Sequence, residues 1–183
     1  MGETQKKWVT VLGVGNVLLR DEGAGIWVLR QLEARYDFPP NVRLVDGGVL
    51  GLSLTGLMME SRRVLVIDAV RGGDEPGTIY RFDFEAKPAH IQYKDSLHQI
   101  DLMEAMGSLA LIGDAPEVTV IGVEYEDIVN WGMELTERVQ KAVEPMVELV
   151  VQELQGMGLV VTPKEHPQEV ANVLGGACQS YRN

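Results

Sequence analysis

The segment Arg63 to Ala69 limits the possible folds most strongly, because it contains the aliphatic run Val-Leu-Val-Ile followed by Asp68. A strand that is apolar at successive positions is buried on both faces, which is typical of a parallel sheet covered by helices on both sides. Trp8 to Val14 is a second apolar run, and it ends at the turn signal Gly15-Asn16. The sequence therefore predicts a mainly parallel sheet between two layers of helices.

The rest of the chain alternates between strand and helix patterns. Further strands are expected at Val42–Val45, Gly77–Asp83 and Val118–Val123, and helices at 26–36, Leu52–Met59, 96–109 and Leu135–Gln155. Only Val70 to Pro76 separate two of the strands, whereas a parallel crossover needs about a dozen residues or more, so the strand at Gly77–Asp83 is expected to be antiparallel. The predicted fold class is α/β, a three-layer sandwich around a mainly parallel five-stranded sheet with one antiparallel strand.

The 183 residues are enough for one domain with a sizeable core, which we place at residues 1–159. From Val160 onward the chain carries Pro163, Pro167 and Gly175-Gly176 with little periodicity. We expect residues 160–183 to form a mobile C-terminal tail.

Charge and cysteine content exclude several classes of partner. The net charge of −11 repels polyphosphates, so we expect no nucleic acid partner. The longest apolar runs, such as Val147 to Val151, are far shorter than the roughly 20 residues that cross a bilayer, so we expect no membrane association. The only cysteine, Cys178, cannot form an internal disulfide, which suits a reducing compartment and predicts a cytoplasmic protein.

Three residues are candidates for a metal site. Asp68 ends an apolar strand, where a carboxylate must be hydrogen-bonded, paired or bound to metal, although it could equally cap a loop. His98 is expected in the first turn of a helix, because Ser96 and Gln99 have capping-box spacing, and alone it is more typical of a polar helix start than of a ligand. With Glu22 they form a set of two oxygens and one nitrogen that suits a borderline divalent ion.

The order of the strands decides whether these side chains meet. In open α/β sheets, ligands bind beyond the carboxyl ends of the strands, near the point where strand order reverses. If the order is flavodoxin-like, the first and third strands flank that point, and Glu22 and Asp68 face one crevice. The motif Gly13-Val14-Gly15 in the same region resembles part of a dinucleotide fingerprint, but Leu18 replaces the third glycine, so glycines serving a tight turn are preferred.

Four blocks carry motifs in a fixed order, namely Val11–Gly25 (VLGVGNVLLRDEGAG), Val45–Gly48 (VDGG), Val66–Ala69 (VIDA) and Ser96–Gln99 (SLHQ). Together they resemble the successive motifs of the nickel-iron hydrogenase maturation endopeptidases, and the resemblance extends to about Gly158. It implies an endopeptidase that removes a C-terminal peptide from the precursor of a hydrogenase large subunit after nickel insertion. By motif position, it implies that Glu22, Asp68 and His98 are the catalytic, metal-engaging residues.

The resemblance also bears on cofactor and specificity. It implies that nickel is supplied by the substrate, so no tightly bound cofactor is expected in the resting enzyme. Asp46, Gly47 and Gly48 match the family's Asp-Gly-Gly-Thr loop and are the predicted substrate-recognition residues, but Val49 replaces the threonine. Two alternatives remain: a nickel carrier or sensor that uses the same three ligands without hydrolysis, and a flavin or nucleotide-binding module on the same fold.

Overall fold

The computed structural model describes residues 8–48, 54–91, 106–111, 113–168 and 170. Its main sheet has the strand order β3-β1-β4-β6-β5. The strands are β1 (Trp8–Val14), β3 (Val42–Gly48), β4 (Ser61–Val70), β5 (Ile79–Asp83) and β6 (Glu117–Glu124). All neighbouring pairs are parallel except β5 with β6, which confirms the antiparallel strand predicted from the short connection.

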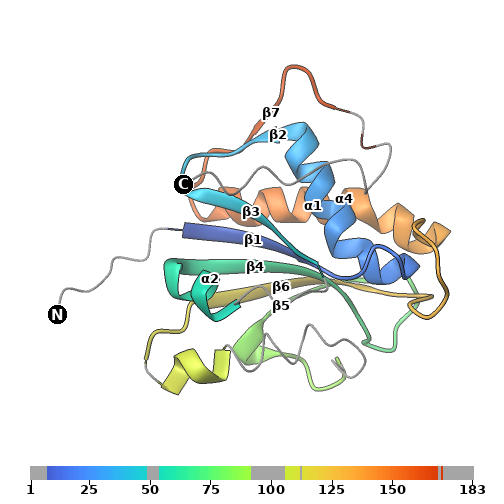
Figure 1. Cartoon of the computed structure of the whole chain (residues 1–183), viewed down its shortest axis with the longest axis horizontal. Coiled ribbons are helices and arrows are strands. Elements are labelled where there is room, and N and C mark those ends of the chain that lie inside the picture. Colours follow the sequence, from blue (N-terminus) through green and yellow to red (C-terminus); the bar gives the residue numbers. More distant parts are fainter. Residues whose placement is uncertain (1–7, 49–53, 92–105, 112, 169, 171–183) are drawn as a thin grey trace.

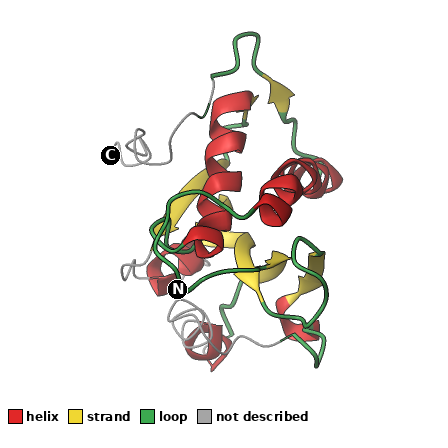
Figure 2. Ribbon diagram, turned by 90° about the vertical axis from the view of Figure 1, so that its right-hand side faces the viewer, coloured by secondary structure: helices red, strands yellow, loops and turns green. Residues whose placement is uncertain are grey.

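Helices cover both faces of this sheet (Figure 1). On one face lie α1 (Ala24–Arg35) and α4 (Glu137–Gly156), and on the other lie α2 (Leu54–Glu60) and the helical residues 106–111. Two 3₁₀ turns, η1 (Arg20–Gly23) and η2 (Phe84–Ala86), complete the elements near the sheet. Figure 2 shows the helices on both sides of the strands, with the end of the sheet at which β1 finishes turned toward the viewer. The predicted three-layer sandwich is confirmed.

The strands are apolar at successive positions because alternate side chains enter different cores. In β1, Val9 and Val11 pack into the core under α1 and α4, whereas Leu12 belongs to the core under α2. In β4, Leu65 and Ile67 face the first core, and Val64 and Val66 face the second. Asp68 follows the alternation of Val64 and Val66, so it lies on the α2 side of the sheet.

The chain reverses its direction of travel across the sheet at β1. From β1 it passes to β3 on one side and then to β4 on the other, so the carboxyl ends of β1 and β4 flank the switch point. This is the flavodoxin-like arrangement on which the predicted crevice depends. Among the described residues, no helix is both long enough and apolar enough to span a membrane.

The segment after α4 makes backbone contacts that its sequence did not predict. Thr162–Pro163 forms the short strand β7, antiparallel to β2 (Tyr36–Asp37), and Val161 is buried. The backbone N–H of Lys164 donates to the Arg35 carbonyl at 2.8 Å, and that of Gln168 donates to the Ala34 carbonyl at 3.1 Å. Backbone hydrogen bonds therefore hold residues 160–168 along the end of α1. Because such bonds do not depend on side-chain type, the sequence shows no periodicity here. Residues 171–183 of the expected tail lie outside the described residues.

Candidate active site

Glycines let the start of α1 approach the switch point closely. A Cβ atom on Gly25 would lie 2.2 Å from the Ile67 carbonyl oxygen in β4 and 2.4 Å from that of Val14 in β1. Gly15 has a φ of 129°, and a Cβ there would lie 1.7 Å from the carbonyl oxygen of Glu22. These contacts match the preferred interpretation of the Gly-rich motif, in which the glycines serve tight packing. They also bring the backbone that carries Glu22 onto the ends of β1 and β4.

Glu22 lies in η1, directly beside this packed junction. Its Oε2 atom is buried and accepts no hydrogen bond from the part of the chain that the structure describes. Burial raises the pKa of the Glu22 carboxyl above its ordinary value. A carboxylate oxygen that has lost its water without gaining a donor costs free energy. An incoming cation or hydrogen-bond donor would remove that cost.

Asp68 lies near the carboxyl end of β4, one residue after the Ile67 carbonyl that Gly25 contacts. It is only 4% exposed, and its Oδ1 accepts a hydrogen bond of 2.8 Å from the backbone N–H of Ala69. The segments that carry Asp68 and Glu22 therefore meet at the switch point. That their two carboxylates face one crevice remains a prediction.

The third predicted ligand, His98, lies outside the described residues, as does the expected start of its helix. Within the described ranges, no group of three or more His, Cys, Asp or Glu side chains is placed to hold a metal ion. The set of Glu22, Asp68 and His98 therefore remains a prediction.

The loop predicted for substrate recognition is shaped by Asp46. Its Oδ1 accepts a hydrogen bond of 3.0 Å from the Gly48 backbone N–H, and its Oδ2 pairs with Arg30 Nη2 of α1 at 3.2 Å. Gly48 has a φ of 46°, in the left-handed region. Asp46 therefore fixes the turn at the end of β3, on the α1 side of the sheet. The predicted role of Asp46, Gly47 and Gly48 in substrate choice stays a prediction.

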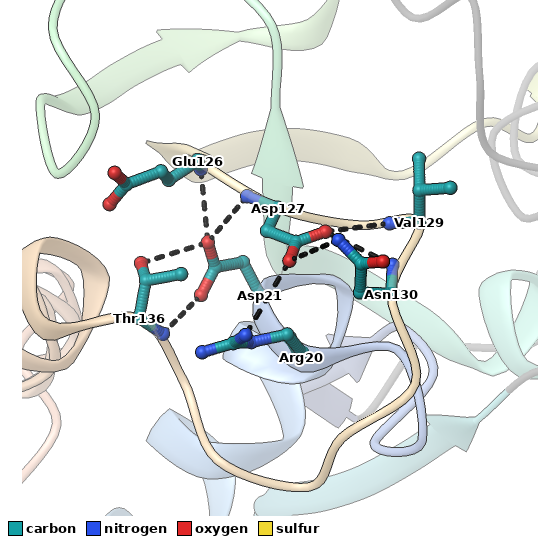
Figure 3. A network of polar contacts seen from close by, with 7 residues as sticks. All are labelled: Arg20, Asp21, Glu126, Asp127, Val129, Asn130 and Thr136. Atoms are coloured by element: carbon teal, nitrogen blue, oxygen red, sulfur yellow. Dashed lines mark hydrogen bonds and ion pairs between the residues drawn. The ribbon is translucent and has the colours of Figure 1, made fainter.

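The role of Asp21, the residue before Glu22, was not predicted from the sequence. Asp21 is fully buried, and Figure 3 shows it among its polar partners. Its Oδ2 accepts hydrogen bonds from the backbone of Glu126 at 3.0 Å and of Asp127 at 2.9 Å, and from the Thr136 hydroxyl at 2.9 Å. Its Oδ1 accepts from the Thr136 backbone at 2.7 Å. Asp21 thus ties η1 to residues 126–136, in the connection between β6 and α4. These partners are more than a hundred positions away, so no local pattern could reveal them.

Comparison with known proteins identifies the family. The family model described as hydrogenase maturation protease matches residues 26–153, more than half of the chain. This protein belongs to the hydrogenase maturation protease family. The resemblance found in the sequence motifs is therefore confirmed, and the protein is a hydrogenase maturation endopeptidase.

Individual relatives agree with the family model over most of the chain. The hydrogenase 2 maturation protease of Escherichia coli is 35% identical over 159 residues, which is 86% of this chain and 96% of that protein. The hydrogenase expression/formation protein HupD of Bradyrhizobium diazoefficiens is 34% identical and covers 90% of this chain and 86% of its own length. The structure of the E. coli hydrogenase maturating endopeptidase HybD has a TM-score of 0.79 at 34% identity, covering 86% of this chain and 98% of that one. The similarity to the maturation protease structure thus extends over most of the chain.

Proposed function

We propose that this endopeptidase removes a C-terminal peptide from the nickel-loaded precursor of a hydrogenase large subunit, and that Glu22, Asp68 and His98 recognise the nickel. The observation that carries the proposal is the buried Glu22 oxygen, which has no partner among the described residues and lies at the switch point beside the end of β4. In α/β sheets this is the place at which ligands bind. Two carboxylates and an imidazole are a donor set that a borderline divalent ion accepts.

In this proposal nickel is a feature of the substrate. A precursor that already holds nickel brings most of the ligands, and the three side chains of the protease add to them. Alone, a set that is poor in nitrogen and has no sulfur holds a free divalent ion only modestly, so the resting enzyme would carry no tightly bound cofactor. Metal loading would then be the checkpoint for cleavage. The single cysteine supports the assignment of this reaction to the cytoplasm.

The charge state of Glu22 fits this order of events. Without substrate, burial disfavours the ionised form of the Glu22 carboxyl and so raises its pKa. A divalent cation next to the carboxyl lowers that pKa and favours the ionised form. A loaded precursor would therefore stabilise the ionised carboxylate that burial disfavours, and a nickel-free precursor would not.

The decisive experiment mixes the purified protein with nickel-loaded and nickel-free precursor and follows the mass of the C-terminal peptide. Cleavage of the loaded form alone supports the proposal, and cleavage of both forms contradicts nickel recognition. His98→Ala should abolish cleavage of the loaded precursor while leaving the melting temperature nearly unchanged.

Metal analysis of the protein purified without chelator tests whether the resting enzyme carries a tightly bound metal ion. Stoichiometric, tightly bound nickel in the isolated protein would contradict a resting enzyme without bound metal and favour the carrier or sensor hypothesis.

A further inference from the structure

Exposed apolar side chains gather on two loops next to the candidate active site. Trp131 is 80% exposed and Val129 is 79% exposed, both in the connection between β6 and α4. Leu18, in the loop that follows β1, and Met133 are exposed as well. We call these four residues the Trp131 patch. Both loops leave the carboxyl ends of their strands, so the patch lies at the same edge of the sheet as Glu22.

Backbone hydrogen bonds join the two loops. The Gly132 N–H donates to the Leu18 carbonyl at 3.0 Å, and the Arg20 N–H donates to the Gly132 carbonyl at 2.8 Å. Leu19 and Gly132 form a parallel β-bridge. The two backbones are closely packed here, because a Cβ on Gly132 would lie 3.1 Å from Arg20 Cγ. The neighbours of Gly132 in the patch are thereby held beside Leu18.

The loop that carries Trp131 is also fixed from within (Figure 3). Besides the four hydrogen bonds to buried Asp21, Asp127 Oδ1 accepts from the backbone of Val129 at 3.1 Å and of Asn130 at 3.0 Å. Asp127 also pairs with Arg20 at 3.6 Å. The side chain of Val129 points away from this network. The loop is therefore held in one conformation that leaves its apolar side chains in water.

Such a surface is suited to binding another protein. Single exposed apolar residues are common on protein surfaces, but adjacent ones on preorganised loops mark interaction sites. Tryptophan is enriched among the residues that dominate binding energy. A loop already held in its binding conformation loses less entropy on association.

We propose that the Trp131 patch docks the hydrogenase large-subunit precursor whose C-terminal segment enters the site at Glu22, an inference that rests on the proposed function. Leu18 is joined to Glu22 by only three residues, so a folded protein that delivers a chain end to Glu22 would cover the patch. A second copy of this chain seated there would obstruct that access. Exposed Glu126 and Glu134 flank the apolar residues. The complementary surface of the precursor is therefore an apolar pocket with lysine or arginine at its rim.

The test compares Trp131→Ala with Trp131→Phe and with the control Val160→Ala. Val160 is 72% exposed and lies just beyond the end of α4, whose 20 residues place it about 30 Å from the loop. Binding and cleavage of nickel-loaded precursor from the same organism are both measured. Trp131→Ala should raise Kd and KM at least about 10-fold, with kcat unchanged within about two-fold. Trp131→Phe should restore most of the affinity, and Val160→Ala should behave as wild type. All three variants should melt as wild type does, because these side chains are exposed.

The outcomes separate this inference from the proposed function. Wild-type cleavage together with unchanged Kd and KM in Trp131→Ala would overturn the docking surface and leave the proposed function intact. Precursor binding that depends on Trp131 without any cleavage would support the docking surface and overturn the proposed function. Sedimentation gives the remaining outcome: a wild-type dimer that Trp131→Ala dissociates, with precursor binding unchanged, would assign the patch to a second copy and overturn the inference.

Discussion

The two edges of the sheet differ in how far their buried polar side chains are hydrogen-bonded. At the amino edge, where β1, β3 and β4 begin, the Ser61 hydroxyl donates to the Leu57 carbonyl at 2.7 Å and lies 2.8 Å from Thr10 Oγ1. Arg43 donates to both hydroxyls, at 2.8 Å to Thr10 and 3.1 Å to Ser61, and its guanidinium lies 5.3 Å from the centre of the Trp8 ring. The polar groups of this edge bind one another.

The carboxyl edge leaves polar atoms without partners. Among the described residues, the buried side-chain nitrogen and oxygen atoms that lack a hydrogen bond belong to Arg20, Glu22, Trp27 and Arg30. All four residues lie in η1 and α1, the segment that follows the switch point. Polar groups that pair within the fold contribute stability, whereas unpaired ones cost stability and are available to a ligand. The comparison predicts that substitutions at the two edges affect different properties.

Among substitutions of described residues at the two edges, the largest effect on activity is expected from Glu22→Gln, which keeps the shape of the side chain and removes its charge. Cleavage of loaded precursor should fall by at least the roughly 10- to 100-fold that loss of an outer-shell partner of a metal ligand costs. The melting temperature at neutral pH should not fall, because the lost oxygen has no partner in the described residues. Steady-state kinetics and thermal melting of the same preparation check both parts. A variant that retains activity would exclude Glu22 from the site.

The largest effect on stability is expected from Asp21→Asn. The amide would place its NH₂ group against backbone N–H groups that now donate to the carboxylate. The free energy of unfolding should fall by about 3 kcal/mol, and cleavage should fall as well because η1 positions Glu22. Denaturant titration measures the first effect. Thr136→Ser, which keeps the hydroxyl, is the matched control and should cost less than about 1 kcal/mol. If Asp21→Asn also lowers the free energy of unfolding by less than about 1 kcal/mol, the network is not needed to hold the loop.

Ser61→Ala should lower stability without changing catalysis. Removing the hydroxyl leaves Thr10 and Arg43 short of a partner, at a cost of about 1 to 2 kcal/mol. Because the 10 residues of β4 separate the two edges by roughly 30 Å, kcat/KM for the precursor should be unchanged within about two-fold. A tenfold loss of kcat/KM with intact folding would mean that the amino edge communicates with the site, and the contrast between the edges would fail.

The structural features that depend on neighbouring residues were predicted from the sequence. The apolar run in β4 and the short connection before β5 gave the parallel sheet and its antiparallel strand, because both follow from burial and chain length. The long first motif indicated the family that the comparisons confirm. Contacts between distant segments could not be predicted: Asp21 meets Thr136 over 115 positions, and nothing in the neighbouring residues distinguishes it from a surface aspartate.

The exposure of Trp131 was missed for a related reason. A tryptophan between Asn130 and Gly132 is compatible with a buried or an exposed side chain, and only its exposure in the folded structure shows which it is. The packing of residues 160–168 against β2 and α1 was not predicted, because backbone pairing does not depend on an apolar period. Local patterns thus predicted the elements, and long-range polar contacts determined how the loops around the site are held.

The smallest expected effect is the pH dependence of stability, and it has opposite signs at Glu22 and at Glu137. Burial raises the pKa of Glu22, so the folded protein binds this proton more tightly than the unfolded chain does. The free energy of unfolding therefore falls as pH rises from the unfolded pKa to the folded pKa, and the full cost persists above it. Glu22→Gln avoids that cost. The variant should therefore melt slightly above wild type at neutral pH and at the same temperature as wild type below about pH 4.

At Glu137, a hydrogen bond from Lys141 lowers the pKa of the carboxyl. The lower pKa adds stability above the unfolded pKa, and this stability is lost on acidification. Glu137→Gln should thus melt slightly below wild type at neutral pH. Paired melts at the two pH values in low salt measure both differences. A Glu22→Gln variant that melts lower than wild type at neutral pH would show that the carboxylate is already paired in the resting protein, and the contrast between the two edges would lose its central observation.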